Sequence, residues 1–159
     1  MSKNSKTASD SRLSQLTDWA TQPLNQQRQQ LSLSCENPIN LEPLTGDAGF
    51  RRYFRVSQQD TSWILVDAPT ETENTLGFTA IAATLRTQGL QVPEVFAADI
   101  EQGFMLLSDL GEQLYSQSLE GAVSSTVDLL YGDALDALHR IQQCTSTATY
   151  PLPKFDKAL

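Results

Sequence analysis

Residues 45–55 read TGDAGFRRYFR, a cluster of small, turn-forming residues that runs directly into an aromatic and basic stretch. Positions 45–49 favour a tight turn, and the aromatic and β-branched residues that follow favour a strand. Side chains alternate between the two faces of a strand. The expected faces are Arg51, Tyr53 and Arg55 on one side, and Phe50, Arg52, Phe54 and Val56 on the other. One face would therefore carry two cations that flank a tyrosine.

The glycines of this turn allow backbone N–H groups to approach an anion closely, because no Cβ stands in the way. The arginines just beyond could add charge-assisted, bidentate contacts to phosphate oxygens. The spacing of Gly46 and Gly49 is a weak signal by itself. An ordinary β-hairpin whose arginines pair with surface carboxylates explains the same residues equally well, so both interpretations stay open.

Working outward from the hairpin, the hydrophobic pattern predicts a sheet interrupted by one helix. Short apolar or aromatic runs separated by turn residues indicate strands. The expected strands cover residues 39–44, 50–56, 63–66, 95–98 and 104–107. A helix should begin at Asn74 or Thr75 and stop at Gly89, with Phe78, Ile81, Ala82 and Leu85 on one face.

Further helices are expected on both sides of the sheet. The first should begin near Asp10, after a polar and frayed N-terminal stretch, and end soon after Pro23. The Gln-rich stretch 26–30 fits either more helix or a linker. The last helix should run from about Ser125 to Gln142 and bury one apolar face, formed by Val127, Leu130, Ala134, Leu138 and Ile141. The whole order predicts the α+β class.

The composition indicates one globular domain of 159 residues with 40% apolar residues and a net charge of −8. That charge argues against a nucleic-acid partner, which would require a basic patch. The longest apolar runs, such as 104–107, are too short to cross a bilayer, and the polar N-terminus is unlike a secretory signal. We therefore expect a cytoplasmic protein without a membrane partner. Cys35 and Cys144 are expected to be free thiols, although a disulfide between them stays open.

Four motifs together resemble the aminoglycoside-phosphotransferase-like kinases. They are GDAGFRRYFR at 46–55, ILVDAP at 64–69, GLQVPEV at 89–95 and GFMLLSDLG at 103–111. The resemblance is strongest to the bacterial anomeric kinases for N-acetylmuramate and N-acetylglucosamine, which serve cell-wall sugar recycling. It covers the chain from about Leu13 onward, and the first motif is specific to that subgroup.

This resemblance implies the N-terminal lobe of a protein-kinase-like fold, a five-stranded antiparallel sheet with one packed helix. An N-terminal helix would precede the lobe and linker helices would follow it. The implied divisions are residues 1–34 for the tail and first helix, 35–110 for the nucleotide-binding lobe, and 111–159 for the hinge, the linker helices and the start of a second lobe.

The resemblance also implies an ATP site. The loop 46–50 would cover the phosphates, the Ser108 carbonyl and the Leu110 amide would bond the adenine edge, and Val66 and Leu107 would line the adenine pocket. Taken alone, Asp109 is more simply a turn or cap residue before Gly111. The implied nucleotide-binding residues are Gly46, Asp47, Ala48, Gly49, Phe50, Arg51, Arg52, Val66, Leu107, Ser108, Asp109 and Leu110.

One departure from the kinase pattern concerns the phosphate-binding cation. Kinases place a lysine on the third strand and pair it with a glutamate on the following helix. Here that strand reads WILVD at 63–67, no lysine occurs from residue 7 to 153, and residues 74–88 contain no acid. We therefore expect an arginine of the second strand, Arg51 or Arg52, to supply the charge.

A second departure concerns the chemistry. Phosphoryl transfer requires a carboxylate that orients the attacking hydroxyl and further side chains that hold Mg²⁺. The family supplies them from a His-x-Asp loop and a later Asp, whereas the single histidine here, His139, is followed two residues later by Ile141. No catalytic residue and no metal ligand is expected in this chain, so the chain by itself should be inactive.

The sequence therefore predicts the ATP-binding lobe of a kinase that transfers the γ-phosphate to the anomeric hydroxyl of an N-acetylated amino sugar, with ATP and Mg²⁺ as cofactors. Two alternatives stay open. The lobe could belong to an aminoglycoside- or choline-type kinase, or the chain could be a non-catalytic module that binds a nucleotide or a partner through the apolar face of its last helix.

Overall fold

The computed structural model describes residues 4–35, 38–44 and 49–152, with the backbone alone for residues 4–10. Its contacts define two compact units: residues 1–79 together with 94–109, and residues 80–93 together with 110–159. No helix in the described ranges combines the length and the apolar character that crossing a bilayer requires.

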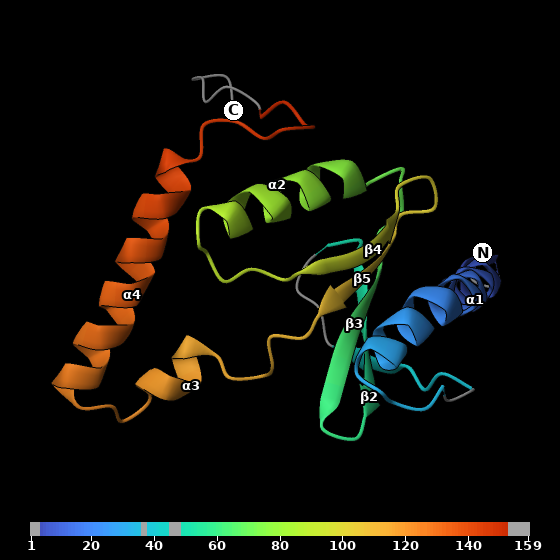
Figure 1. Ribbon diagram of the computed structural model, residues 1–159, viewed down its shortest axis with the longest axis horizontal. Helices are drawn as coiled ribbons and strands as arrows, with labels where there is room; N and C mark the ends of the chain where they lie inside the picture. Colours follow the sequence, from blue (N-terminus) through green and yellow to red (C-terminus); the bar gives the residue numbers. More distant parts are fainter. Residues whose placement is uncertain (1–3, 36–37, 45–48, 153–159) are drawn as a thin grey trace. The chain divides into compact units, whose positions relative to one another are not determined.

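The first unit is built on a five-stranded sheet (Figure 1). All neighbouring strands are antiparallel, and the order across the sheet is β1-β2-β3-β5-β4. The strands are β1 (Glu42–Leu44), β2 (Arg52–Gln58), β3 (Thr61–Asp67), β4 (Val95–Asp99) and β5 (Phe104–Ser108). The prediction of a five-stranded antiparallel sheet is confirmed, although β1 is shorter than expected. This is the architecture of a kinase-like N-terminal lobe.

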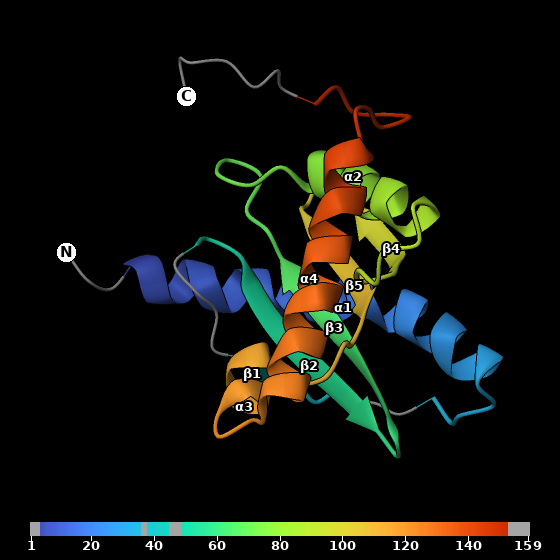
Figure 2. The same ribbon diagram turned by 90° about the vertical axis from the view of Figure 1, so that its left-hand side faces the viewer.

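One long helix, α1 (Asn4–Gln30), covers one face of this sheet (Figure 1 and Figure 2). Leu16, Ala20 and Leu24 recur every four residues on α1, which places them on one stripe, and all three are completely buried. They pack in one cluster with side chains of the sheet: Phe54, Val56, Trp63, Leu65, Phe104 and Leu106. The helix therefore completes the larger core of the unit.

The expected bounds of this helix were wrong at both ends. The helix begins at Asn4 rather than near Asp10, and it continues through Pro23 to Gln30, so the Gln-rich stretch is helical. A proline inside a helix costs about 3 kcal/mol. Burial of a leucine side chain contributes about 1.5–3 kcal/mol. The buried residues on either side of Pro23 therefore offset its penalty, and local propensity does not decide where the helix ends.

The opposite face of the sheet carries a second, smaller cluster. Ile64, Val66, Ala68, Met105 and Leu107 are buried there, and Tyr53 and Phe78 pack against them. Tyr53 thus lies on one face of β2 while Phe54 and Val56 lie on the other, which confirms the predicted alternation.

Helix α2 (Thr75–Thr87) has the predicted ends. The Asn74 side chain caps its first turn by accepting a hydrogen bond from Gly77 N–H at 2.7 Å. Gly89 ends it with φ +75°, a conformation that favours glycine. The predicted buried face is correct for Ala82, whereas Ile81 is 37% exposed and Ala80 is buried instead.

The second unit contains α3 (Tyr115–Leu119), which the sequence did not predict, and α4 (Ser124–Gln143), which it did. The prediction that α4 buries an apolar face was wrong: none of its residues is buried, and Leu138 and Ile141 are 48% and 45% exposed. Val127, Leu130 and Ala134 of the predicted face are half-buried. Cys35 and Cys144 are both free, as expected.

Candidate functional site

The predicted phosphate loop lies only partly within the described residues. Gly46, Asp47 and Ala48 fall outside them, so their expected role stays a prediction. Gly49 and Phe50, which lead into β2, are exposed, and 66% of the Phe50 surface is open to solvent. The first charged side chain after this loop is Arg51.

Arg51 is held at the start of α2. Its Nε atom lies 2.9 Å from Oε2 of Glu73 in an ion pair, and its guanidinium carbon lies 5.2 Å from the ring centre of Phe78. The side chain remains 26% exposed. Arg51 is thus paired with Glu73 through Nε and keeps part of its side chain open to solvent, and a guanidinium in that setting can bind an anion.

Sequence reasoning missed Glu73 as the partner of this arginine. An acidic partner was expected within the helix, at residues 74–88, whereas Glu73 lies just before α2. The available signal was its position, because a carboxylate next to a helix N-terminus is stabilised by the helix dipole.

Arg52 points to the other face of the sheet. Its Nε atom donates a hydrogen bond to Oδ2 of Asp67 at 2.9 Å, and Arg12 of α1 donates from Nε to Oδ1 of the same carboxylate at 2.7 Å. The Asp67 side chain is completely buried. Arg12 also donates to the Gln102 carbonyl at 2.7 Å and stacks over Phe104. Arg52 therefore belongs to a buried ion network that holds α1 on the sheet.

Asp109 directly follows β5, and its side chain is largely buried. Arg55 of β2 donates to its Oδ2 from Nε at 2.6 Å and to its Oδ1 from Nη2 at 3.3 Å. Ser62 of β3 donates to Oδ2 at 2.7 Å. Only 11% of the Arg55 side chain and 7% of the Asp109 side chain are exposed. The partners Arg55 and Ser62 were not predicted from the sequence, and the interpretation of Asp109 as a turn or cap residue before Gly111 stays a prediction.

The remaining predicted residues lie at the end of β5 and inside the second cluster. The Ser108 N–H donates to the Glu94 carbonyl at 2.9 Å, and the Ser108 hydroxyl accepts from Glu94 N–H at 2.9 Å. Val66 and Leu107 are buried, with exposed fractions of 0% and 3%, and Leu110 is 55% exposed. The fold therefore brings Arg51, Val66, Leu107 and Asp109 to one side of the sheet and separates them from Arg52.

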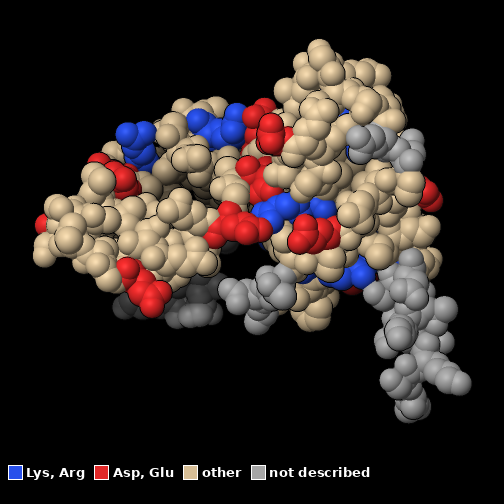
Figure 3. Space-filling model, turned by 90° about the horizontal axis from the view of Figure 1, so that it is seen from below, with Lys and Arg blue, Asp and Glu red and all other residues tan. Residues whose placement is uncertain are grey.

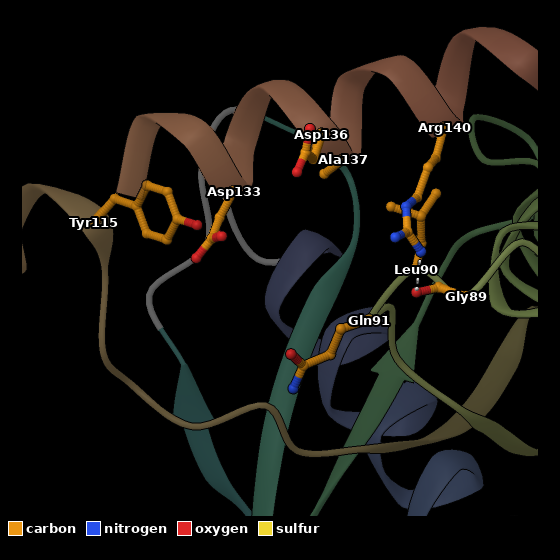
Figure 4. A pocket seen from close by; sticks show the side chains of 8 residues that line it. All are labelled: Gly89, Leu90, Gln91, Tyr115, Asp133, Asp136, Ala137 and Arg140. Carbon is orange, nitrogen blue, oxygen red and sulfur yellow. Dashed lines mark hydrogen bonds between the residues drawn. The ribbon is translucent and has the colours of Figure 1, made fainter. Parts of the chain in front are cut away.

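A hollow of about 470 Å³ lies within the second unit (Figure 4). Residues 89–91 form one wall and α3 and α4 form the other. Arg140 reaches from α4 to the Gly89 carbonyl, with a donor–acceptor distance of 3.5 Å. Asp133 and Asp136 line the same hollow and are exposed. These contacts join α4 to the connection that follows α2, and they assemble no buried polar site.

Basic and acidic side chains are mixed on the face that Figure 3 shows. Figure 3 shows one face on which basic and acidic side chains lie next to each other, without a continuous basic patch. In the ranges 4–35, 38–44 and 49–152, no group of three or more His, Cys, Asp or Glu residues could hold a metal ion. The described residues therefore show mixed charge and no such cluster, and the role of Arg51 in binding an anion stays a prediction.

Comparison with known proteins identifies the family. The profile of the phosphotransferase enzyme family matches residues 40–159, which is most of the chain. This chain belongs to that family. The match begins after α1, so this phosphotransferase carries its N-terminal helix in addition to the matched part.

Three bacterial relatives of this phosphotransferase share the name N-acetylmuramate/N-acetylglucosamine kinase. The protein from Pseudomonas putida is 38% identical over 150 residues, which cover 94% of this chain and 43% of the relative. The protein from Pseudomonas aeruginosa is 40% identical over 122 residues, which cover 77% of this chain and 35% of the relative. The protein from Caulobacter vibrioides is 29% identical over 160 residues, which cover 79% of this chain and 44% of the relative. The chain thus spans less than half the length of these curated relatives.

Proposed function

We propose that this chain supplies the ATP-binding lobe of a cytoplasmic sugar kinase that transfers the γ-phosphate of ATP to the anomeric hydroxyl of an N-acetylated amino sugar, in cell-wall recycling. Residues 35–110 would form the lobe itself. The family match and the shared name of the relatives support the reaction and the acceptor class. The observation on which the proposal depends is the setting of Arg51.

Arg51 has the properties that a phosphate-binding cation in a kinase requires. Kinases anchor such a cation with a carboxylate near the first helix of the lobe. Glu73 supplies that carboxylate, and Phe78 supports the guanidinium from its ring face. Arginine presents a planar fork that can bind two phosphate oxygens at once. Arg51 would therefore take the part of the missing lysine, and the adjacent residues 46–50 would cover the phosphates.

The adenine end of the proposed site lies at the end of β5. The Ser108 carbonyl and the Leu110 amide would bond the edge of the base, and Val66 and Leu107 would form the apolar surface behind it. Both apolar residues belong to the cluster that Phe78 also contacts. The phosphate-binding and base-binding ends are thus supported by one continuous set of packed side chains.

The proposal assigns neither a catalytic base nor a metal ligand to residues 1–159. When bound, Mg²⁺ neutralises charge on the phosphates, but the described residues offer no cluster to hold it. What this chain does is bind and orient the nucleotide. We expect it by itself to bind ATP without transferring phosphate.

Calorimetric titration with ATP and with inorganic tripolyphosphate tests the site. Arg51→Gln should weaken the binding of both ligands about 10- to 100-fold, because a charged hydrogen bond contributes about 1.5–3 kcal/mol. Arg86→Gln is the matched control, since Arg86 is an exposed arginine in the last turn of α2. Unchanged affinity of the Arg51 variant, or no ATP binding by the parent chain, would refute the proposal.

Turnover is tested separately with labelled ATP and N-acetylglucosamine. Transfer of label to the sugar by the purified 159-residue chain would contradict the assignment of catalytic groups outside it.

A further inference from the structure

We propose that Arg55, Ser62 and Asp109 form a clamp that positions the segment 108–110 for the base of the nucleotide and so sets base selectivity. None of the three is proposed to touch the ligand; they are positioning residues. This inference rests on the proposed nucleotide site and adds to it the part of the molecule that selects the base.

The clamp fixes both oxygens of a single carboxylate. Arg55 donates to Oδ2 at 2.6 Å and to Oδ1 at 3.3 Å, and Ser62 donates to Oδ2 at 2.7 Å. The three donors come from two neighbouring strands, β2 and β3, which are paired along their whole length. A carboxylate held in this way cannot rotate freely, so the backbone that carries it is fixed against the sheet.

Burial distinguishes this cluster from ordinary surface ion pairs. Exposed pairs contribute little to stability because water screens them. Here the exposed fractions of the Arg55 and Asp109 side chains are only 11% and 7%. The two charges are therefore held close together under weak screening, and loss of either one leaves the other buried without its counter-ion.

The segment is also held from the side of β4. The Ser108 N–H and hydroxyl form a reciprocal pair of hydrogen bonds with the backbone of Glu94, each 2.9 Å long. Residues 108 and 109 are thus anchored to Glu94, the residue before β4, on one side and to β2 and β3 on the other. Beyond Asp109 the next residue, Leu110, is 55% exposed. Gly111 then adopts φ +85°, which favours glycine.

The anchored residues are those whose backbone groups would bond the base. Asp109 lies between the Ser108 carbonyl and the Leu110 amide in the chain, so a turn of its backbone would redirect both groups. Small misplacements of binding groups reduce affinity strongly, because hydrogen bonds require donor–acceptor distances near 3 Å. The phosphate-binding residue Arg51 has different partners, Glu73 and Phe78. Disruption of the clamp should therefore impair recognition of the base and spare that of the phosphates.

Affinities for ATP, GTP and tripolyphosphate separate these effects. Asp109→Asn removes the charge that Arg55 and Ser62 bind and keeps the size of the side chain. It should weaken ATP binding about tenfold, lower the ratio of ATP to GTP affinity, and leave tripolyphosphate binding unchanged. Asp60→Asn makes the same charge change in the exposed β2–β3 turn and should alter none of the three affinities. Arg51→Gln should instead weaken ATP and tripolyphosphate equally.

Ser62→Ala is a milder variant that decides the matter if Asp109→Asn does not fold. It removes one donor and should weaken ATP binding about threefold without affecting tripolyphosphate. The clamp is refuted if the folded variants keep the parent ratio of ATP to GTP affinity, or if they lose tripolyphosphate binding to the same extent as ATP. Failure of the parent chain to bind any of the ligands would instead refute the proposed nucleotide site, and the clamp with it.

Discussion

Replacement of Asp67 by Asn is the sharpest test of how α1 is held on the sheet. The Asp67 side chain has no exposed surface and receives hydrogen bonds from Arg12 and Arg52. Removing one member of a buried ion pair costs about 3–5 kcal/mol, because the remaining charge loses its counter-ion. Arg12 and Arg52 are 27% and 33% exposed, so water relieves part of that loss. We therefore expect Asp67→Asn to lower the free energy of unfolding by about 3 kcal/mol.

Urea unfolding followed by tryptophan fluorescence measures this change. Trp63 belongs to the cluster on which α1 packs. With a slope of about 2 kcal/mol per molar urea, the midpoint should fall by about 1.5 M. Arg12→Gln leaves the carboxylate bonded to Arg52 and should have a smaller effect. Asp60→Asn is the matched control and should change stability by no more than about 0.5 kcal/mol. If Asp67→Asn unfolds at the same urea concentration as the control, the network does not hold the helix.

Two further predictions concern the β4–β5 turn. Gly103→Ala should destabilise the protein by about 3 kcal/mol in the same urea assay, because φ is +74° and the added Cβ would lie 1.9 Å from the Ala68 carbonyl oxygen. Gly111→Ala is the control, because Gly111 has φ +85° and no atom lies within 4 Å of the added Cβ. It should lower the free energy of unfolding by only about 1 kcal/mol. Equal losses of stability in the two variants would refute the steric argument. Hydrogen bonds from the Gln102 side chain and backbone lower the pKa of Asp99 below its ordinary value of 3.8. The folded carboxyl thus binds its proton more weakly than the unfolded one, so Asp99 stabilises the fold above about pH 4 and loses that effect as the pH falls through its lowered pKa. Gln102→Ala should raise the pKa of Asp99 in an NMR titration, and an unchanged pKa would contradict the assigned cause.

The strands and the ends of α2 could be predicted because their signals are local. Alternation in residues 50–56 and the Asn74 and Gly89 signals each depend on a few neighbouring residues. The end of α1 could not be predicted from Pro23. The helix continues because Ala20 and Leu24 are buried against a sheet whose strands lie later in the sequence. Tertiary packing overrode local propensity.

The partners of the charged residues were unpredictable for a different reason. Arg55 and Asp109 are 54 residues apart in the sequence. They meet because β5 lies next to β3 in the sheet, and β3 lies next to β2. The alternation of apolar and polar residues along one strand does not reveal which strands are its neighbours in the sheet. Sequence alone placed Arg51 and Arg52 on opposite faces of the strand. It could not decide which of the two would bind phosphate, because it did not show that Asp67 pairs with Arg52.

The position of α1 affects how this phosphotransferase can be shortened. The family match starts at residue 40, so an expression fragment cut to the bounds of the family match would omit α1. Such a fragment would leave Leu65, Phe104 and Leu106, all now without exposed surface, facing water on an uncovered side of the sheet. Aggregation of that fragment would reflect the lost helix and would reveal nothing about nucleotide binding.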